Sequence, residues 1–262
     1  MSAALDHLVI NTRFDTDAAA TLFTQLGFTL TPRGHHSLGS INHLMMFAEG
    51  YLELIGLPLG TDTLRQEVLD SPRGIDGLVI ATHDPKSTHA ELVREGFLVQ
   101  PVQHFSRPVE IDGISRNARF GTVRLAPGQF AAGRVYFCHH ETPELVWRPE
   151  WLGHANGVTA VAGLTVVSED PETTRQQYAR LGTFDERFRL DMVDASALAL
   201  RFGDLASQQT QRPERFAAIT LRGADLAGIA QRAANLGLAH QRDSERVVLA
   251  IPAFDTLLEF IP

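Results

Sequence analysis

The sequence has only one cysteine, Cys138, among its 262 residues. One cysteine cannot form a disulfide bond within the chain, which fits a reducing compartment. No uninterrupted apolar run reaches the roughly 18 residues that a membrane-spanning helix needs, and the first residues lack the basic and apolar segments of a signal peptide. We therefore expect a cytoplasmic protein with no membrane partner.

Basic residues are also scarce. The chain has 23 lysines and arginines against 31 aspartates and glutamates, a formal net charge of −8, and no basic run offsets this balance. Such a charge opposes the capture of nucleic acid. A phosphate-binding glycine loop, a Cys-x-x-Cys pair and a Gly-x-Ser-x-Gly nucleophile elbow are missing too. The expected partner is a small molecule.

The residues that are present predict a folded protein with internal repeats. Hydrophobic residues make up 44% and charged residues 21% of the chain, which is typical of globular domains. Four times, an apolar strand-like run is followed by a helical pattern that ends in glycine. The terminal glycines lie 20 or 21 residues after equivalent strand positions; they are Gly27, Gly96, Gly182 and Gly237. This equal spacing predicts one repeated module.

Further strand-like runs complete each module as strand, helix, strand, strand, strand. They lie at 41–48 and 51–57 in the first module, 121–126 and 133–140 in the second, 188–195 and 196–203 in the third, and 245–252 and 256–262 in the fourth. The polar, proline-interrupted segment 99–119 is expected to be a long loop that covers a site. A segment rich in Pro, Trp, Gly and Asn, 148–158, is expected to contain the main domain boundary.

The runs LDHLVI (5–10) and YLELIG (51–56), together with the four modules, carry a family resemblance. The sequence resembles the vicinal oxygen chelate superfamily of glyoxalases, extradiol dioxygenases and bleomycin-resistance proteins, and it is most similar to the glyoxalase-like branch. The resemblance implies an α+β fold, in which four βαβββ modules pair into two half-open mixed β-barrels. We expect a first domain at 1–150 that carries the site and a second at 158–262 whose site is degenerate.

The resemblance also implies a divalent metal ion, held by inward-facing side chains of the first and last strands of the modules. His7 matches the first-strand ligand and Glu53 the last-strand ligand. In the second module, Gly77 stands where His7 stands in the first, so a third ligand would come from the Cys138-His139-His140 run. The sequence does not distinguish Fe, Mn, Zn and Ni.

Strand alternation sharpens this set. Glu53 shares one face with Tyr51, and a carboxylate buried there needs a metal or a hydrogen-bond donor. Because His140 shares a face with Cys138, we predict His7, Glu53 and His140 as ligands, with His139 as an alternative. Glu53 is also the candidate catalytic base. Asp6 is expected to face away from His7 and to support nearby backbone or a neighbouring residue, steadying the start of the strand, rather than to bind the metal.

Further polar and aromatic residues are candidates for substrate binding: Asn42, His43, Tyr51 and Trp147. His43 shares its face with Met45 and Phe47, so it is expected either to line the cavity or to replace a ligand. Simpler interpretations stay open, because Glu53 would also be satisfied by a tyrosine or an arginine and Trp147 would also serve as an interdomain clamp. Glu259 copies Glu53 without a matching imidazole, so we expect the second half to act as a structural or dimerising partner, with a homodimer as an open alternative.

Two functions follow. The first is a metal-dependent lyase, isomerase or dioxygenase that acts on a small substrate with vicinal oxygens. The alternative is a metal-free protein of the same fold that binds or sequesters a small molecule, which the glycine at position 77 favours.

Overall fold

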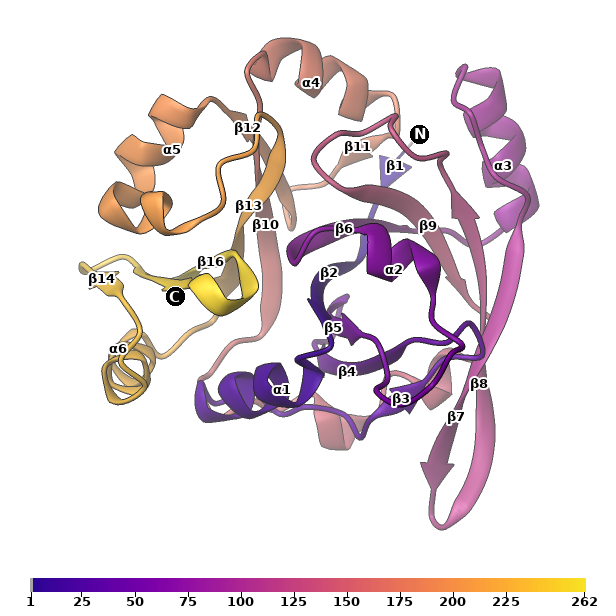
Figure 1. The fold of residues 1–262 in the computed structure, drawn as a ribbon, viewed down its shortest axis with the longest axis horizontal. Helices are drawn as coiled ribbons and strands as arrows, with labels where there is room; N and C mark the ends of the chain where they lie inside the picture. Colours follow the sequence, from indigo (N-terminus) through magenta and orange to yellow (C-terminus); the bar gives the residue numbers. More distant parts are fainter. Residues whose placement is uncertain (1) are drawn as a thin grey trace.

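The computed structural model describes residues 2–262 and contains two large mixed β-sheets with helices on their outer faces (Figure 1). The strand order of the eight-stranded sheet is β3 (Gly34–His35), β4 (Ile41–Met46), β5 (Tyr51–Gly56), β2 (Leu5–Arg13), β6 (Gly74–Ala81), β9 (Arg134–His140), β8 (Ile114–Arg124) and β7 (Gln103–Ile111). The order of the six-stranded sheet is β12 (Arg189–Val193), β10 (Ala160–Val167), β13 (Arg215–Arg222), β16 (Thr256–Ile261), β15 (Val247–Ile251) and β14 (His240–Arg242). The short strands β1 (Ser2–Ala3) and β11 (Thr183–Phe184) pair and connect the two halves.

Six α-helices accompany the strands in the described residues: α1 (Thr16–Gln25), α2 (Gln66–Asp70), α3 (Pro85–Arg94), α4 (Pro171–Ala179), α5 (Ala195–Phe202) and α6 (Leu226–Asn235). Short 3-10 helices lie at Pro143–Leu145, Pro149–Trp151, Gly203–Gln208 and Pro252–Phe254. Aspartate side chains cap α3, α4, α5 and α6, as is common at helix N-termini. None of the helices within 2–262 is long and apolar enough to cross a membrane.

The module repeat is confirmed for the first, second and fourth modules, whereas the third lacks its last strand. Parallel pairing joins the first and last strands of a module, β2 with β5 and β6 with β9, and antiparallel pairing of β2 with β6 joins two modules into one sheet. The glycines that end α1 and α6 have positive φ, 91° at Gly27 and 67° at Gly237, a conformation in which glycine is favoured. The fold is therefore α+β, with βαβββ modules paired into two barrel-like halves.

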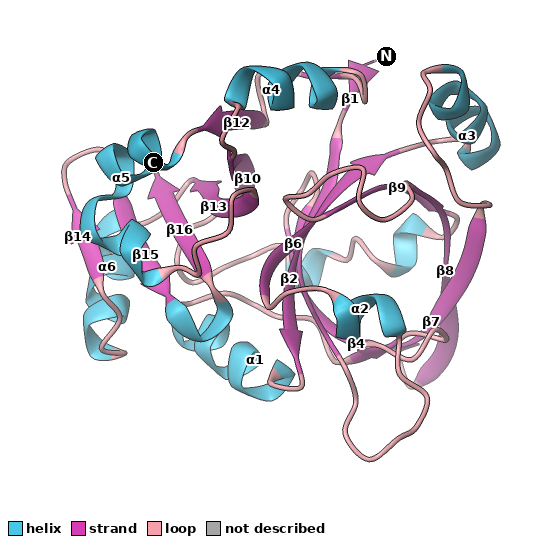
Figure 2. Cartoon of the chain, turned by 45° about the horizontal axis from the view of Figure 1, so that its top comes forward, coloured by secondary structure: helices cyan, strands magenta, loops and turns pink. Residues whose placement is uncertain are grey.

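The eight-stranded sheet curves into a nearly closed barrel, which we call the first barrel (Figure 2). Its edge strands β3 and β7 approach each other, and the Ser37 backbone N–H donates to the carbonyl oxygen of Ser106 at 3.0 Å. The six-stranded sheet has no such closure in the described residues. The chain passes from one sheet to the other between His140 and Ala160, and the exact domain limits stay a prediction.

The expected loop at 99–119 is wrong, because most of it belongs to the β7–β8 hairpin. Ile111 and Ile114 form the last pair of the hairpin, and Asp112 and Gly113 make the turn with φ of 52° and 74°. An Asp-Gly pair between two strands is the strongest short hairpin signal. Pro108 is tolerated because β7 is an edge strand.

The expected strand at 196–203 is also wrong, because these residues form α5. The Asp194 carboxylate accepts from the Ala197 N–H at 2.7 Å and caps the helix. Leu198 and Phe202, four residues apart, are buried on one side while Leu200 is 89% exposed. The apparent alternation of apolar residues was a helical period, and the second sheet consequently has six strands.

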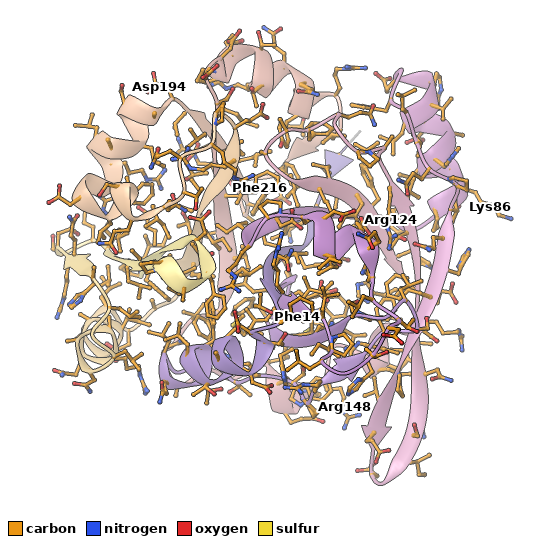
Figure 3. The ribbon with its side chains drawn as sticks, viewed as in Figure 1. Phe14, Lys86, Arg124, Arg148, Asp194 and Phe216 are labelled. Atoms are coloured by element: carbon orange, nitrogen blue, oxygen red, sulfur yellow. The ribbon has the colours of Figure 1, made fainter. Side chains whose placement is uncertain are left out.

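Side chains of β2 point alternately to the two faces of the sheet, and each face belongs to a different hydrophobic core. Leu8 and Ile10 belong to the large core shared with the second half, whereas Val9 belongs to the apolar lining of the first barrel. The halves pack closely at Phe216 (Figure 3), where a Cβ atom added to Gly133 would lie 2.6 Å from the Phe216 ring. The barrel interior is thus separated from the interdomain core by one strand layer.

Candidate functional site

A β-bulge near the start of β2 brings two adjacent side chains together. The register between β2 and β6 shifts between Leu5 and His7, so Asp6 has no partner in that ladder. The Asp6 carboxylate lies 2.5 Å from His7 Nδ1. The prediction that Asp6 faces away from His7 is therefore wrong, because strict alternation does not hold across a bulge.

Asp6 also binds a second imidazole. Its Oδ1 lies 3.1 Å from His140 Nε2, so one buried carboxylate joins His7 to His140. Burial alone would raise the pKa of Asp6, but the charge and hydrogen bond of His140, followed by those of His7, outweigh it and hold this pKa below its ordinary value. Because Nδ1 of His7 is bonded to Asp6, Nε2 is the ring nitrogen left for a further group.

Glu53 faces that free nitrogen. Its Oε2 lies 3.6 Å from His7 Nε2, and its Oε1 accepts from the Asn42 amide at 2.6 Å. Burial would raise the pKa of Glu53, but His7 first, and then the Asn42 hydrogen bond, lower it. His36 Nε2 lies 4.0 Å from Oε1, and burial lowers the pKa of His36 to about 3, so this imidazole is neutral.

Tyr136 is a site residue that our sequence analysis missed. Its hydroxyl lies 3.4 Å from His7 Nε2, and burial followed by Glu53 raises its pKa, so the phenol stays protonated. Val79 pairs with Tyr136 as Val9 pairs with Glu53, which makes Tyr136 the counterpart of Glu53 in the second module. The sequence contained a signal for it: Glu53 lies three residues after Gly50, and Tyr136 lies three residues after Gly133, the glycine that precedes the equivalent strand.

These groups line a cavity of about 20 Å³ inside the first barrel, which we call the inner cavity. Its lining comprises His7, His36, Asn42, Leu44, Tyr51, Glu53, Arg65, Phe105, Arg107, Phe120, Thr122, Arg124, Tyr136 and Cys138. Its volume suits one or two water molecules. The three arginines were not predicted.

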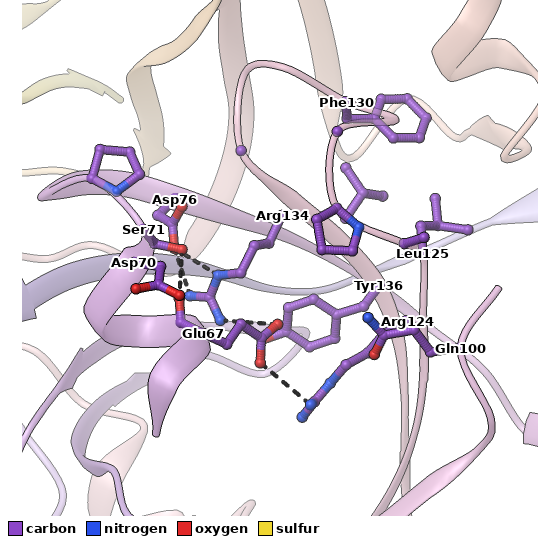
Figure 4. A pocket seen from close by; sticks show the side chains of 16 residues that line it. Glu67, Asp70, Ser71, Asp76, Gln100, Arg124, Leu125, Phe130, Arg134 and Tyr136 are labelled. Atoms are coloured by element: carbon purple, nitrogen blue, oxygen red, sulfur yellow. Dashed lines mark hydrogen bonds and ion pairs between the residues drawn. The ribbon is translucent and has the colours of Figure 1, made fainter. Parts of the chain in front are cut away.

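A larger cavity of about 570 Å³, the outer cavity, is lined by side chains of α2, β6, β8, β9 and the connection between β8 and β9 (Figure 4). Arg124 and Tyr136 belong to the linings of both cavities, so these two side chains separate them. On the outer side, Glu67 of α2 contacts three arginines: Arg65 at 2.8 Å, Arg124 at 3.3 Å and Arg134 at 3.6 Å.

The remaining predicted residues fall in different places. The Tyr51 ring stacks on His7 with centroids 4.3 Å apart. The Trp147 ring lies 4.7 Å from that of His140, and its Nε1 donates to the Phe47 carbonyl oxygen at 3.1 Å, so it packs at the His140 end of the barrel. His139 turns to the Thr82 carbonyl oxygen, 3.1 Å from its Nδ1.

His43 lies outside the inner cavity. Its Nδ1 is 2.8 Å from the Thr31 carbonyl oxygen, and its side chain borders a shallow pocket beside α1. Met45 and Phe47, which share its strand face, belong to the core under the helices, while Leu44 points into the barrel. The expectation that His43 lines the cavity is thus corrected: the shared face exists, but it is the outer one.

The donors around His7 fit a divalent ion. Two ligands each about 2.1 Å from one ion lie about 3–4 Å apart, which matches the 3.6 Å between His7 Nε2 and Glu53 Oε2. A carboxylate behind the histidine, here Asp6, is the usual support of a metal-binding imidazole. His140 reaches this pair through Asp6. One ligand atom each of Asp6, Cys138 and His140 also lies within 4.8 Å of the others, but Asp6 already binds both imidazoles there.

Comparison with known proteins agrees with this architecture. The chain belongs to the Glyoxalase-like domain family, whose profile matches residues 5–182. That range covers the first barrel and the beginning of the second half. The family and the fold are those of the vicinal oxygen chelate superfamily. No curated protein matches the sequence.

Solved structures share the fold at low sequence identity. A hypothetical protein from Staphylococcus aureus is 12% identical with a TM-score of 0.66, over 100% of this chain and 99% of that one. A variant of 4-hydroxymandelate synthase from Streptomyces coelicolor is 13% identical with a TM-score of 0.57, over 99% and 92%. A fusion of a xylose isomerase-like TIM barrel with 4-hydroxyphenylpyruvate dioxygenase is 11% identical with a TM-score of 0.56, over 98% and 49%.

Proposed function

We propose that the protein is a metal-dependent enzyme that acts on a small substrate with two neighbouring oxygen atoms, and that the first barrel is its active site. His7 and Glu53 hold the divalent ion in this proposal. The observation that carries it is the Asp6–His7–Glu53 chain of contacts, at 2.5 and 3.6 Å, inside a nearly closed barrel. An ion bound there would polarise the substrate oxygens.

The side chains around the pair have separate tasks. Asp6 fixes the orientation and tautomer of His7, and the Asn42 amide holds one oxygen of Glu53. Tyr136, protonated, donates a hydrogen bond to an oxygen that gains negative charge. Glu53, ionised, accepts a proton from the substrate when it is not fully engaged as a ligand. These groups support a lyase or isomerase as well as the dioxygenase type of relative.

His140 is assigned a supporting role. Its Nε2 bonds to Asp6, so it reaches His7 through the shared carboxylate. The second module supplies no first-strand ligand, because Gly77 has no side chain. A larger residue does not fit there without a shift, since a Cβ atom at Gly77 would lie 2.7 Å from a methyl group of Val9. In this proposal a further ligand comes from His36, whose Nε2 lies 4.0 Å from Glu53 Oε1, rather than from β6.

The experiment measures metal in the protein and in matched variants. Native protein, His7→Gln, Glu53→Gln and the control His43→Gln are loaded with Mn²⁺, Fe²⁺ or Zn²⁺, and metal content and affinity are determined by elemental analysis and calorimetry. We expect one ion in native protein and the control, and loss of binding in the other two. Stoichiometric metal in folded His7→Gln would contradict the assignment.

The second candidate is a metal-free binding protein. Gly77 favours it, since no imidazole is possible there without displacing Val9. It predicts that a bound small molecule raises the melting temperature equally with and without chelator. Absence of metal in folded, reconstituted native protein would make it the leading function.

A further inference from the structure

One arginine in the inner cavity has no negatively charged partner. Arg107 lies on β7, is 3% exposed, and lines the cavity together with His7 and Glu53. Within residues 2–262 its Nη2 atom has no hydrogen-bond partner. Burial lowers the pKa of Arg107, and only the charges of Tyr51 and Glu53 act in the other direction. A guanidinium remains protonated in proteins, so this buried charge needs an anion.

The fold leaves room for this side chain. A Cβ atom at Gly34 would lie 3.1 Å from both Cδ and Nη1 of Arg107, and 2.2 Å from the Asn42 Oδ1. A glycine at this point of β3 therefore lets Arg107 extend beside the amide that holds Glu53. Asn42 Oδ1 also lacks a hydrogen-bond partner in the described residues. Donor and acceptor groups thus gather on this side of the inner cavity without contacting each other.

A second guanidinium faces the same cavity. Arg124 is 8% exposed, and its Nε and Nη2 atoms have no partner within residues 2–262, while Nη1 lies 3.3 Å from Glu67. Burial lowers the pKa of Arg124 as well. Arg65, also in the lining, is hydrogen-bonded to Glu67. The inner cavity therefore has two arginines with free donors and one carboxylate, Glu53.

We propose that Arg107 and Arg124 form an anion subsite for the carboxylate of a small organic acid. The position of the acid's reacting oxygens beside His7 and Glu53 rests on the proposed function. A carboxylate matches the planar fork of a guanidinium, and it is smaller than a phosphate, which suits the narrow inner cavity. The rest of the acid extends past Arg124 and Tyr136 towards the outer cavity, and Arg124 turns to admit it.

The subsite is tested with acids and their neutral amides. Lactate and 3-phenyllactate, lactamide and 3-phenyllactamide, and inorganic phosphate are titrated into chelator-treated and metal-loaded protein, with calorimetry and melting temperature as readouts. We expect the acids to bind at least tenfold more tightly than the amides, since a charge-assisted hydrogen bond is lost. Equal binding of acid and amide, or no binding of either acid, would overturn the proposal, as would phosphate binding that exceeds that of both acids.

Variants separate this subsite from a structural role. Arg107→Met should weaken acid binding at least tenfold and, without ligand, should raise the melting temperature because it removes an unpaired buried charge. Arg116→Met, an exposed arginine on the same hairpin, is the control and should change neither. A lowered melting temperature with unchanged acid affinity in Arg107→Met would overturn the subsite. The two proposals can fail separately. If native protein binds no metal but still binds the acids, and Arg107→Met weakens that binding, the subsite is supported and the proposed metal-dependent function is rejected.

Discussion

Glu53 and Glu259 occupy the same place in the two halves of the molecule and have different surroundings. Glu53 pairs with Val9 between β5 and β2, and Glu259 pairs with Thr220 between β16 and β13. Both are buried, at 5% and 3% exposure. The fold therefore places a buried carboxylate at equivalent points, and the neighbours decide what each does.

Glu259 is satisfied by cations and a hydroxyl. It is bonded to Arg201, to Arg246 at 2.7 Å and to the Thr220 hydroxyl at 2.8 Å. Arg201 comes from α5, the helix that replaces the expected strand of the third module, and it also contacts Asp191 at 3.3 Å. Glu259 is thus the centre of an ion-pair network, with no oxygen left for a metal.

Glu53 accepts one hydrogen bond, from Asn42, and its other oxygen faces Nε2 of His7. Nearby arginines point into the same cavity without bonding to it. The comparison teaches that one fold position serves as a structural ion pair when a helix supplies arginine, and as an open acceptor when imidazoles surround it.

The largest expected effect comes from neutralising the two carboxylates. Glu259→Gln should lower the free energy of unfolding by about 3–5 kcal/mol, because two partly buried arginines lose their counter-charge. Glu53→Gln should cost about 1 kcal/mol in metal-free protein, since the amide still accepts from Asn42. Urea unfolding followed by circular dichroism measures both. Equal losses would mean that Glu53 is structural too.

A second test sharpens the difference at the histidine. Asp6→Asn should weaken metal binding about 10–100-fold, because an amide supports the His7 imidazole less well than a carboxylate. Asp191→Asn, which alters the corresponding network of the second half, is the matched control and should leave the affinity unchanged. Calorimetric titration with Zn²⁺ or Mn²⁺ provides the measurement. An unchanged affinity in Asp6→Asn would separate Asp6 from the metal site.

Local patterns predicted the fold well. Helix-ending glycines and apolar runs identified the modules, because these signals act within a few residues. The errors arose where a local pattern had two solutions: the run at 196–203 alternates like a strand, yet Leu198 and Phe202 form a helical face. The hairpin at 103–124 was hidden by its polar composition, although its Asp-Gly turn was visible.

The site was harder to predict. His7 and Glu53 follow from strand position, and the structure places them 3.6 Å apart, while their role as ligands stays a proposal. The contact of Asp6 with His140 depends on a bulge and on the pairing of β6 with β9, which connect residues 134 positions apart. Arg107 comes from the segment interpreted as a loop, so nothing local pointed it inward, whereas Arg124 lies in the predicted strand at 121–126.

The last expected effect is a pH dependence at His36, the imidazole near Glu53 that has no equivalent near Glu259 among the described residues. Its folded pKa, about 3, lies below the ordinary 6.5, so the unfolded chain binds a proton first as the pH falls. The contribution of His36 to the free energy of unfolding is therefore fully present above pH 6.5 and is lost as the pH falls towards 3. Between pH 6 and 4 the loss from this group is about 1 kcal/mol per pH unit. His36→Gln should flatten this part of the profile in metal-free protein, as measured by urea unfolding at each pH. If the His36→Gln variant showed the same slope as native protein, His36 would take up its proton equally in the folded and unfolded states. The surroundings of Glu53 and Glu259 would then differ less in charge than the geometry indicates.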